Sequence, residues 1–181
     1  MEAEMEEITE QKLLDLDYLS GDGFLTEKGE VLLRLLLKGL PQVYKRRMKP
    51  ETFFALMAKN VPACVELVIV RNGKALLTYR KDQHFIGWHT PGTYISPGET
   101  LEETVQRCAN GELKCRVRFI KHLTVFSNHK DTRFHDLSNL ILCEIAEGEP
   151  QAGEWFSECP PDIIPVHRKF WPVIEQCLKD S

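Results

Sequence analysis

The chain has 181 residues, of which 43% are hydrophobic and 28% are charged, as is usual for a folded domain with a buried core. Its net charge of −4 argues against general electrostatic binding to nucleic acid. The longest apolar stretches, such as residues 31–37, are too short to span a bilayer, so no membrane partner is expected.

The first residues and the cysteines indicate the cellular compartment in which the protein is expected. The first residues, MEAEMEEITE, are acidic, unlike a secretory or mitochondrial signal. The cysteines are scattered and form no CxxC pair: Cys64, Cys108, Cys115, Cys143, Cys159 and Cys177. Zinc sites need closely spaced ligand pairs, so no structural zinc is expected. We expect a cytoplasmic protein with reduced thiols.

The first sixty residues are predicted to be helical. Residues 7–19 carry apolar side chains at helical spacing, and the sequence SGDGF then breaks the helix. Thr26 is the expected N-cap of a second helix that ends near residues 39–41, and a third is expected over residues 50–59, which begin with proline. We therefore expect residues 1–60 to form a helical extension that packs as a cap or as the face of a homodimer.

From residue 63 the pattern becomes that of strands. Residues 64–70 and 74–80 read as a β-hairpin, because Asn72 and Gly73 lie in the turn that joins them. A glycine-punctuated strand is expected next, over residues 88–95.

The remaining elements complete the domain. A helix is expected over residues 100–113, because Thr100 and Glu103 have the spacing of a capping box. Three strands follow, over residues 116–126, 137–145 and 154–156. A closing helix is expected over residues 163–178, with Pro172 kinking or interrupting it. These elements predict an α+β fold, an α/β/α sandwich in which helices flank a mixed β-sheet.

The segment over residues 87–107 resembles the Nudix box and the loop that leads into it. The signature of that family is Gly, five residues, Glu, seven residues, then Arg-Glu-aliphatic-x-Glu-Glu-x-Gly-aliphatic. Residues 88–92 match the approach W-x-x-P-G, Thr93 takes the place of the signature glycine, and Glu99 and Arg107 are in register.

The resemblance assigns residues 61–181 to a Nudix-like domain and leaves the N-terminal helices outside it. It implies hydrolysis of a nucleoside diphosphate linked to another moiety, for example a nucleotide sugar. In such a site helical carboxylates and a loop carbonyl hold Mg²⁺ or Mn²⁺, which neutralises the diphosphate while a base activates water. Glu99 and Arg107 are implied to form an ion pair that fixes the loop to the helix.

The box departs from the family pattern at its carboxylates. Cys108 and Gly111 stand where the family has glutamates, Lys114 replaces a glycine, and Glu112 remains. We therefore expect a single ion and weakened or altered catalysis. Gly111 costs roughly 1 kcal/mol of helix stability, so an early end of the helix is expected. The depleted pattern is similar to that of GDP-mannose mannosyl hydrolases, which use one metal and a loop histidine.

The resemblance and the positions of polar residues give a set of candidate site residues. The expected metal ligands are Glu112, the backbone of Gly92 and Glu149. Glu112 is also a catalytic candidate, and His89 or His135 is the candidate base, because histidine titrates near neutral pH. Arg80, Thr93 and Trp88 are expected to contact the substrate, Arg80 through a phosphate.

Two functions remain open at this point. The first is a metal-dependent hydrolase of the kind just described. The second is a catalytically inactive Nudix-like module that binds a nucleotide or regulates a partner, which the missing glutamates at Cys108 and Gly111 favour. Turnover in the presence of metal separates the two.

Overall fold

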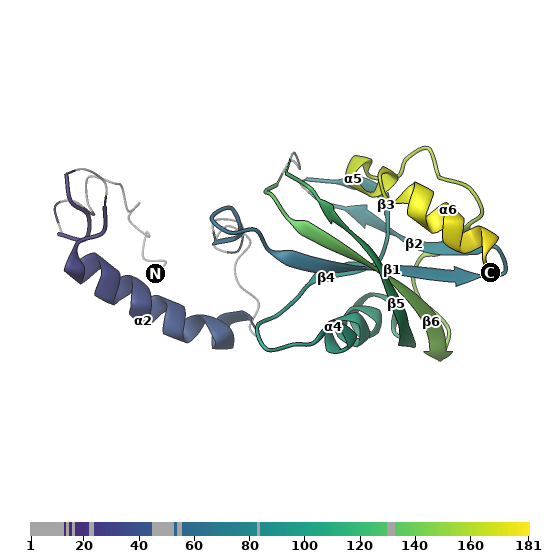
Figure 1. Cartoon of the computed structure of the whole chain (residues 1–181), viewed down its shortest axis with the longest axis horizontal. Helices are drawn as coiled ribbons and strands as arrows, with labels where there is room; N and C mark the ends of the chain where they lie inside the picture. The colour runs from purple at the N-terminus through teal and green to yellow at the C-terminus, as the bar shows by residue number, and fades with distance from the viewer. Residues whose placement is uncertain are drawn as a thin grey trace, which may run out of the picture. The chain divides into compact units, whose positions relative to one another are not determined.

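A computed structural model gives the fold of the chain (Figure 1). It describes residues 13, 15, 17–21, 24–44, 53, 56–82, 84–129 and 133–181, with the backbone alone at 37–44. Contacts divide the chain into the units Met1–Met48 and Lys49–Ser181, a boundary earlier than the one drawn after residue 60. Most of the helix expected over residues 7–19 and half of the one expected over residues 50–59 lie outside the described residues.

The first unit contains helix α2, Glu27–Tyr44. The Thr26 hydroxyl accepts a hydrogen bond from the Gly29 amide at 3.1 Å, which confirms the predicted N-cap. The expected end near residues 39–41 was wrong, because α2 continues through Pro41. Proline removes one backbone donor and can bend a helix without ending it. None of the helices in the described part of the chain is long and apolar enough to cross a membrane.

The second unit is built on a mixed seven-stranded sheet (Figure 1). Its strands are β1 Ala63–Arg71, β2 Lys74–Lys81, β3 Ile86–His89, β4 Gly92–Tyr94, β5 Arg116–Ser127, β6 Leu137–Glu147 and β7 Glu154–Phe156. The order is β3-β2-β1-β6-β5, with β4 also paired to β1 and β7 to β2. Only β1 and β6 run parallel among these pairs.

The hairpin between β1 and β2 is confirmed. Arg71 pairs with Lys74 across the turn. Asn72 and Gly73 both have positive φ, 53° and 68°, which is the geometry that an Asn-Gly pair supplies in a two-residue hairpin loop.

The single strand expected over residues 88–95 was wrong, because the structure divides it into β3 and β4. β3 pairs with β2, whereas β4 pairs with β1. Pro91 lies between them and has no backbone N–H to donate, although its carbonyl accepts from Leu67 at 2.8 Å. The change of partner brings Gly92 directly opposite Glu66 of β1.

Helix α4, Leu101–Cys108, begins with the predicted capping box, since Thr100 and Glu103 bond each other's backbone amides. The helix does not end early at Gly111. It continues as one π-helical turn, η1, Ala109–Leu113, and stops at Lys114, whose φ is 58°. π-helical turns are frequent at functional sites.

The closing helix is interrupted, as expected, and consists of two helices. They are α5, Pro165–Arg168, and α6, Trp171–Lys179. Pro172 lies in the first turn of α6, where no backbone donor is needed, so it begins a helix and does not kink one.

Helices cover both faces of the sheet, which makes the second unit an α/β/α sandwich of the α+β class, as predicted. On β1, Val65, Leu67 and Ile69 join the core cluster beneath α4 and η1. Val68 faces the other way, into the cluster that holds Phe170, Trp171 and Ile174. Because side chains alternate along a strand, Glu66 lies on the same side of β1 as Val68.

Candidate active site

The site begins with a carboxylate inside a central strand. Glu66 is 7% exposed and is the register partner of Gly92 on β4. A Cβ added to Gly92 would stand 2.5 Å from the Glu66 Oε2 atom. Position 92 therefore has to be glycine for the carboxylate to lie against the strand.

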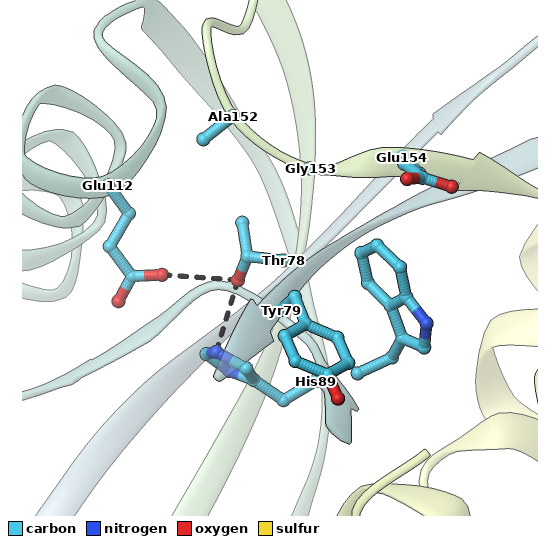
Figure 2. A pocket seen from close by; sticks show the side chains of 8 residues that line it. Thr78, Tyr79, His89, Glu112, Ala152, Gly153 and Glu154 are labelled. Atoms are coloured by element: carbon cyan, nitrogen blue, oxygen red, sulfur yellow. Dashed lines mark hydrogen bonds between the residues drawn. The ribbon is translucent and has the colours of Figure 1, made fainter. Parts of the chain in front are cut away.

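The second carboxylate reaches the same residue from the π-helical turn. The Glu112 carboxylate accepts a hydrogen bond from the Gly92 amide at 3.4 Å and one from the Thr78 hydroxyl at 3.4 Å. Figure 2 shows Glu112 and His89 approaching Thr78 from two sides. Gly92 thus has Glu66 on one side and Glu112 on another.

Burial disfavours the charged form of both carboxyl groups. Burial, together with the nearby charge of Glu112, raises the pKa of Glu66 to about 8 against the effect of the Thr90 hydrogen bond. Burial also raises the pKa of Glu112. Neither forms a salt bridge with a lysine or arginine of the described residues. A bound cation would relieve this cost.

Thr90 and His167 support Glu66 from behind. The Thr90 hydroxyl donates to Glu66 Oε2 at 2.5 Å and lies 2.9 Å from Nδ1 of His167 on α5. The same Nδ1 accepts from the Thr90 amide at 3.3 Å. It is 3.7 Å from Glu66, but burial holds the pKa of His167 well below its usual value, so this imidazole is neutral and the contact is no ion pair.

His89 and Glu112 both contact the Thr78 hydroxyl, and His89 is 8% exposed. Its Nδ1 is 2.7 Å from the Thr90 carbonyl, to which it donates, and its Nε2 is 3.2 Å from the Thr78 hydroxyl. Burial, aided by the charge of Arg80, lowers the pKa of His89 to about 4. The ring is therefore neutral near pH 7, with the Nε2 lone pair available as a hydrogen-bond or proton acceptor.

Two cavities meet at His89 and Glu112, which line both. One, of about 290 Å³, is also lined by Glu66, Arg80 and Arg133. The other, of about 430 Å³, lies on the far side of His89 and Glu112. Both volumes fall near the range of small-molecule sites.

Most of the predicted site residues are brought to these cavities. Glu112, Gly92, His89, Arg80 and Thr93 line the smaller cavity, whereas Trp88 lines the larger one. The Arg80 Nε lies 2.8 Å from Asp82 Oδ2, which holds the guanidinium at the cavity wall.

Two predicted residues are not brought there. Glu149 forms an ion pair with Arg71 at 2.9 Å and lines neither cavity. His135 bonds Ser127 at 2.8 Å and also lines neither.

The pair Glu99–Arg107 ties the loop to α4. Arg107 donates to both carboxylate oxygens of Glu99, each at 2.8 Å. It also donates to the Tyr94 carbonyl at 2.7 Å and to the Thr93 hydroxyl at 3.2 Å. One guanidinium therefore fixes the strand that contains Gly92 relative to the helix that leads to Glu112.

Sequence reasoning missed Glu66, Thr90, His167 and Arg133. A signal for Glu66 was present, since it interrupts the apolar run of residues 64–70, and a carboxylate in a central strand is rarely buried without a purpose. Thr90, His167 and Arg133 carried no such signal, because only the folding of distant segments brings them together.

The donor set fits a single hard cation. Mg²⁺ is commonly held by one or two carboxylates together with substrate phosphates and water. Glu66 and Glu112 supply two carboxylates, and no three His, Cys, Asp or Glu side chains among the described residues are grouped as a metal site. Cys108, at the position of a missing glutamate, is 3% exposed in the core cluster beneath α4, where burial raises the pKa of its thiol.

Fold and site together define an α/β/α domain with reactive groups at the junction of a glycine loop and a helix. The family profile of the NUDIX domain matches residues 62–178. The chain belongs to the NUDIX family.

Individual relatives agree with this assignment. The chain is 33% identical over 92 residues to an ADP-ribose pyrophosphatase from Methanocaldococcus jannaschii, covering 50% of this chain and 54% of that protein. It is 33% identical over 85 residues to a low-salt glycan biosynthesis protein from Haloferax volcanii, covering 46% and 54%. The chain thus spans about half the length of the curated relatives it matches.

A solved structure shares the fold. The crystal structure of an ADP-ribose pyrophosphatase from Streptococcus suis matches with a TM-score of 0.55 at 20% identity, covering 67% of this chain and 92% of that one.

Proposed function

We propose that this protein is a hydrolase of nucleoside diphosphates linked to another moiety, such as a sugar, and that it uses one Mg²⁺ or Mn²⁺ ion. The observation that carries the proposal is the meeting of Glu66 and Glu112 at Gly92, beside the neutral imidazole of His89. The relative from Methanocaldococcus jannaschii is named an ADP-ribose pyrophosphatase, and ADP-ribose belongs to the same substrate class.

Two guanidinium groups of the smaller cavity suit a diphosphate. Arg80 and Arg133 both line it, and guanidinium groups bind phosphate oxygens through paired N–H donors. Across the cavity, Glu66 and Glu112 would hold the cation. When bound, the metal ion supplies charge neutralisation and polarises the scissile phosphate.

The protein's own groups then have separate tasks. Nε2 of His89 accepts a proton from the attacking water, while the bond from Nδ1 to the Thr90 carbonyl fixes the ring and its tautomer. Glu99 and Arg107 hold the loop against the helix so that Gly92 and Glu112 stay together. Thr90 and His167 keep Glu66 directed at the cavity.

The test is turnover of a panel of nucleotide sugars, ADP-ribose and nucleoside triphosphates, with Mg²⁺, with Mn²⁺ and with EDTA. We expect metal-dependent release of products that Glu112→Gln lowers by about 100-fold or more. Product identity locates the cleaved bond. A nucleoside monophosphate means cleavage between the two phosphorus atoms. A nucleoside diphosphate with free sugar means cleavage of the sugar–phosphate linkage, and ¹⁸O from labelled water then appears on the sugar for attack at carbon and on the phosphate for attack at phosphorus.

Binding of these compounds without turnover in any metal would overturn the proposal. It would instead support an inactive nucleotide-binding module, the function that the glutamates missing at Cys108 and Gly111 favour. Equal turnover by wild type and Glu112→Gln would be consistent with a hydrolase but would show that the active site assigned here is wrong.

A further inference from the structure

The larger cavity lies where two strands share one edge of β2. β7 pairs with Ala75, Leu76 and Leu77. β3 takes over at the next residue, because Thr78 pairs with His89. Glu154, the partner of Leu77, therefore stands beside His89 along the edge of β2, and the cavity of about 430 Å³ opens at this junction.

One wall of the cavity is a supported aromatic surface. Tyr79 is 51% exposed, and its ring packs edge-on against Trp88 at 5.1 Å. Trp88 packs in turn against Phe156 at 4.8 Å. The Trp88 backbone is fixed by bonds to the Asp162 carbonyl at 3.1 Å and from the Ile164 amide at 2.9 Å. An exposed ring on a rigid backing is a stacking platform.

The opening beside this wall is kept free of side chains. Gly153 has φ 94°, and a Cβ there would stand 2.5 Å from the Leu77 carbonyl oxygen. With Ala152 before it, the chain crosses the cavity with almost no side-chain volume. Figure 2 shows Glu112 and Glu154 on opposite sides of this opening, with Ala152 and Gly153 between them.

Glu154 supplies hydrogen-bond acceptors at the rim. Its side chain is exposed and has no hydrogen-bond or ion-pair partner among the described residues. An ionised carboxylate only accepts hydrogen bonds. Guanine presents two hydrogen-bond donors side by side on one edge, N1–H and the N2 amino group. On the hydrogen-bonding edge of each other base, the group next to a donor is an acceptor. Guanine is therefore the base that a carboxylate binds through both oxygens.

We infer that this cavity, bounded by Tyr79, Trp88, Gly153 and Glu154, binds the nucleobase of the substrate and prefers guanine. The inference rests on the proposed function. With the base bound in this cavity, the attached diphosphate of the substrate would extend to Glu112 and into the smaller cavity. The base stacks on Tyr79 and bonds to Glu154.

The test uses the full chain and the four nucleoside 5′-monophosphates GMP, AMP, CMP and UMP, which contain no diphosphate bond to cleave. Isothermal calorimetry with Mg²⁺ measures each dissociation constant. We expect GMP to bind tightest, by about tenfold over AMP. Tyr79→Leu is expected to lower the affinity for all four nucleotides by about tenfold, because it removes a stacking surface.

Glu154→Gln distinguishes recognition from stacking. It is expected to raise the dissociation constant of GMP by about tenfold and to change that of AMP by less than about threefold. The matched control is Glu158→Gln, an exposed glutamate outside the cavity, which should change neither. Circular dichroism of each variant verifies folding.

Equal affinity for the four monophosphates, unaltered by Glu154→Gln, would overturn the base preference. If hexose 1-phosphates bind and lose affinity in Tyr79→Leu while the nucleotides do not, the cavity holds the sugar moiety and the inference is wrong. Because the readout is binding, an inactive chain can still satisfy it. An active enzyme without base preference would contradict this inference and leave the proposed hydrolase function standing.

Discussion

Glu66 on β1 and Glu112 on η1 both lie against one residue, Gly92. Glu66 comes from a central strand and Glu112 from the π-helical turn that follows α4. The box helix lacks carboxylates at Cys108 and Gly111, and Glu66 places a second carboxylate beside the one that remains. In the proposed function, this pair of carboxylates would hold the cation that the box sequence alone is not equipped to bind.

Metal binding is expected to depend on Glu66 as much as on Glu112. Glu66→Gln and Glu112→Gln each replace a carboxyl group that can ionise on metal binding by a neutral amide, and each should weaken Mn²⁺ binding by roughly tenfold or more. Calorimetric titration of the free protein measures this without reference to activity. Glu149→Gln is the control, because Glu149 is paired with Arg71 outside both cavities. A loss of Mn²⁺ affinity in Glu149→Gln alone would contradict this ligand set.

Substitution of each candidate histidine is expected to show that His89, and not His135, is the general base. His89→Gln keeps a hydrogen-bonding side chain but cannot take a proton, so kcat should fall by about 10²–10⁴-fold. His135→Gln should leave kcat unchanged, because His135 bonds Ser127 away from the cavities. Steady-state kinetics on the best substrate of the panel decides. The opposite ranking would move the base to His135.

Alanine at two glycines is expected to have opposite effects on stability. Gly92→Ala drives a methyl group into Glu66 and should lower the free energy of unfolding by about 1–3 kcal/mol. Gly111→Ala meets no atom within 4 Å on a helical turn and should raise it by about 0.5–1 kcal/mol. Urea unfolding of both variants provides the comparison. A neutral Gly92→Ala would mean that Glu66 does not pack as described.

The pair Glu99–Arg107 is expected to make stability depend on pH in the acid range. Hydrogen bonds from Arg107 lower the pKa of Glu99 from 4.5 to about 2, so the ionised form stabilises the fold. That contribution is complete above about pH 4.5 and is lost as the pH falls toward 2. Because the side chain is partly solvated, its size is about 1–2 kcal/mol.

Glu99→Gln removes this contribution. Unfolding free energies of wild type and variant should differ most at neutral pH and converge near pH 2. A difference that stays constant across this range would show that the pair acts by hydrogen-bond geometry and not by charge.

The elements that were predicted correctly are those encoded by adjacent residues. Asn72-Gly73 sets a hairpin turn by its own backbone preference, and Thr100 with Glu103 closes a capping box three residues apart. The elements that were wrong depended on partners elsewhere. Residues 88–95 form two strands because β2 and β1 each take one, which no local pattern reveals.

The sequence by itself determined the family, the loop–helix unit and the surviving carboxylate of Glu112, because fixed spacing along one loop and one helix specifies them. The tertiary structure alone decided which groups complete the site. It brings Glu66 from β1, His167 from α5 and Thr90 from the loop after β3 to a common wall, and it leaves Glu149 outside. Buried polar groups must find partners wherever the packed chain supplies them, and sequence separation does not limit that choice.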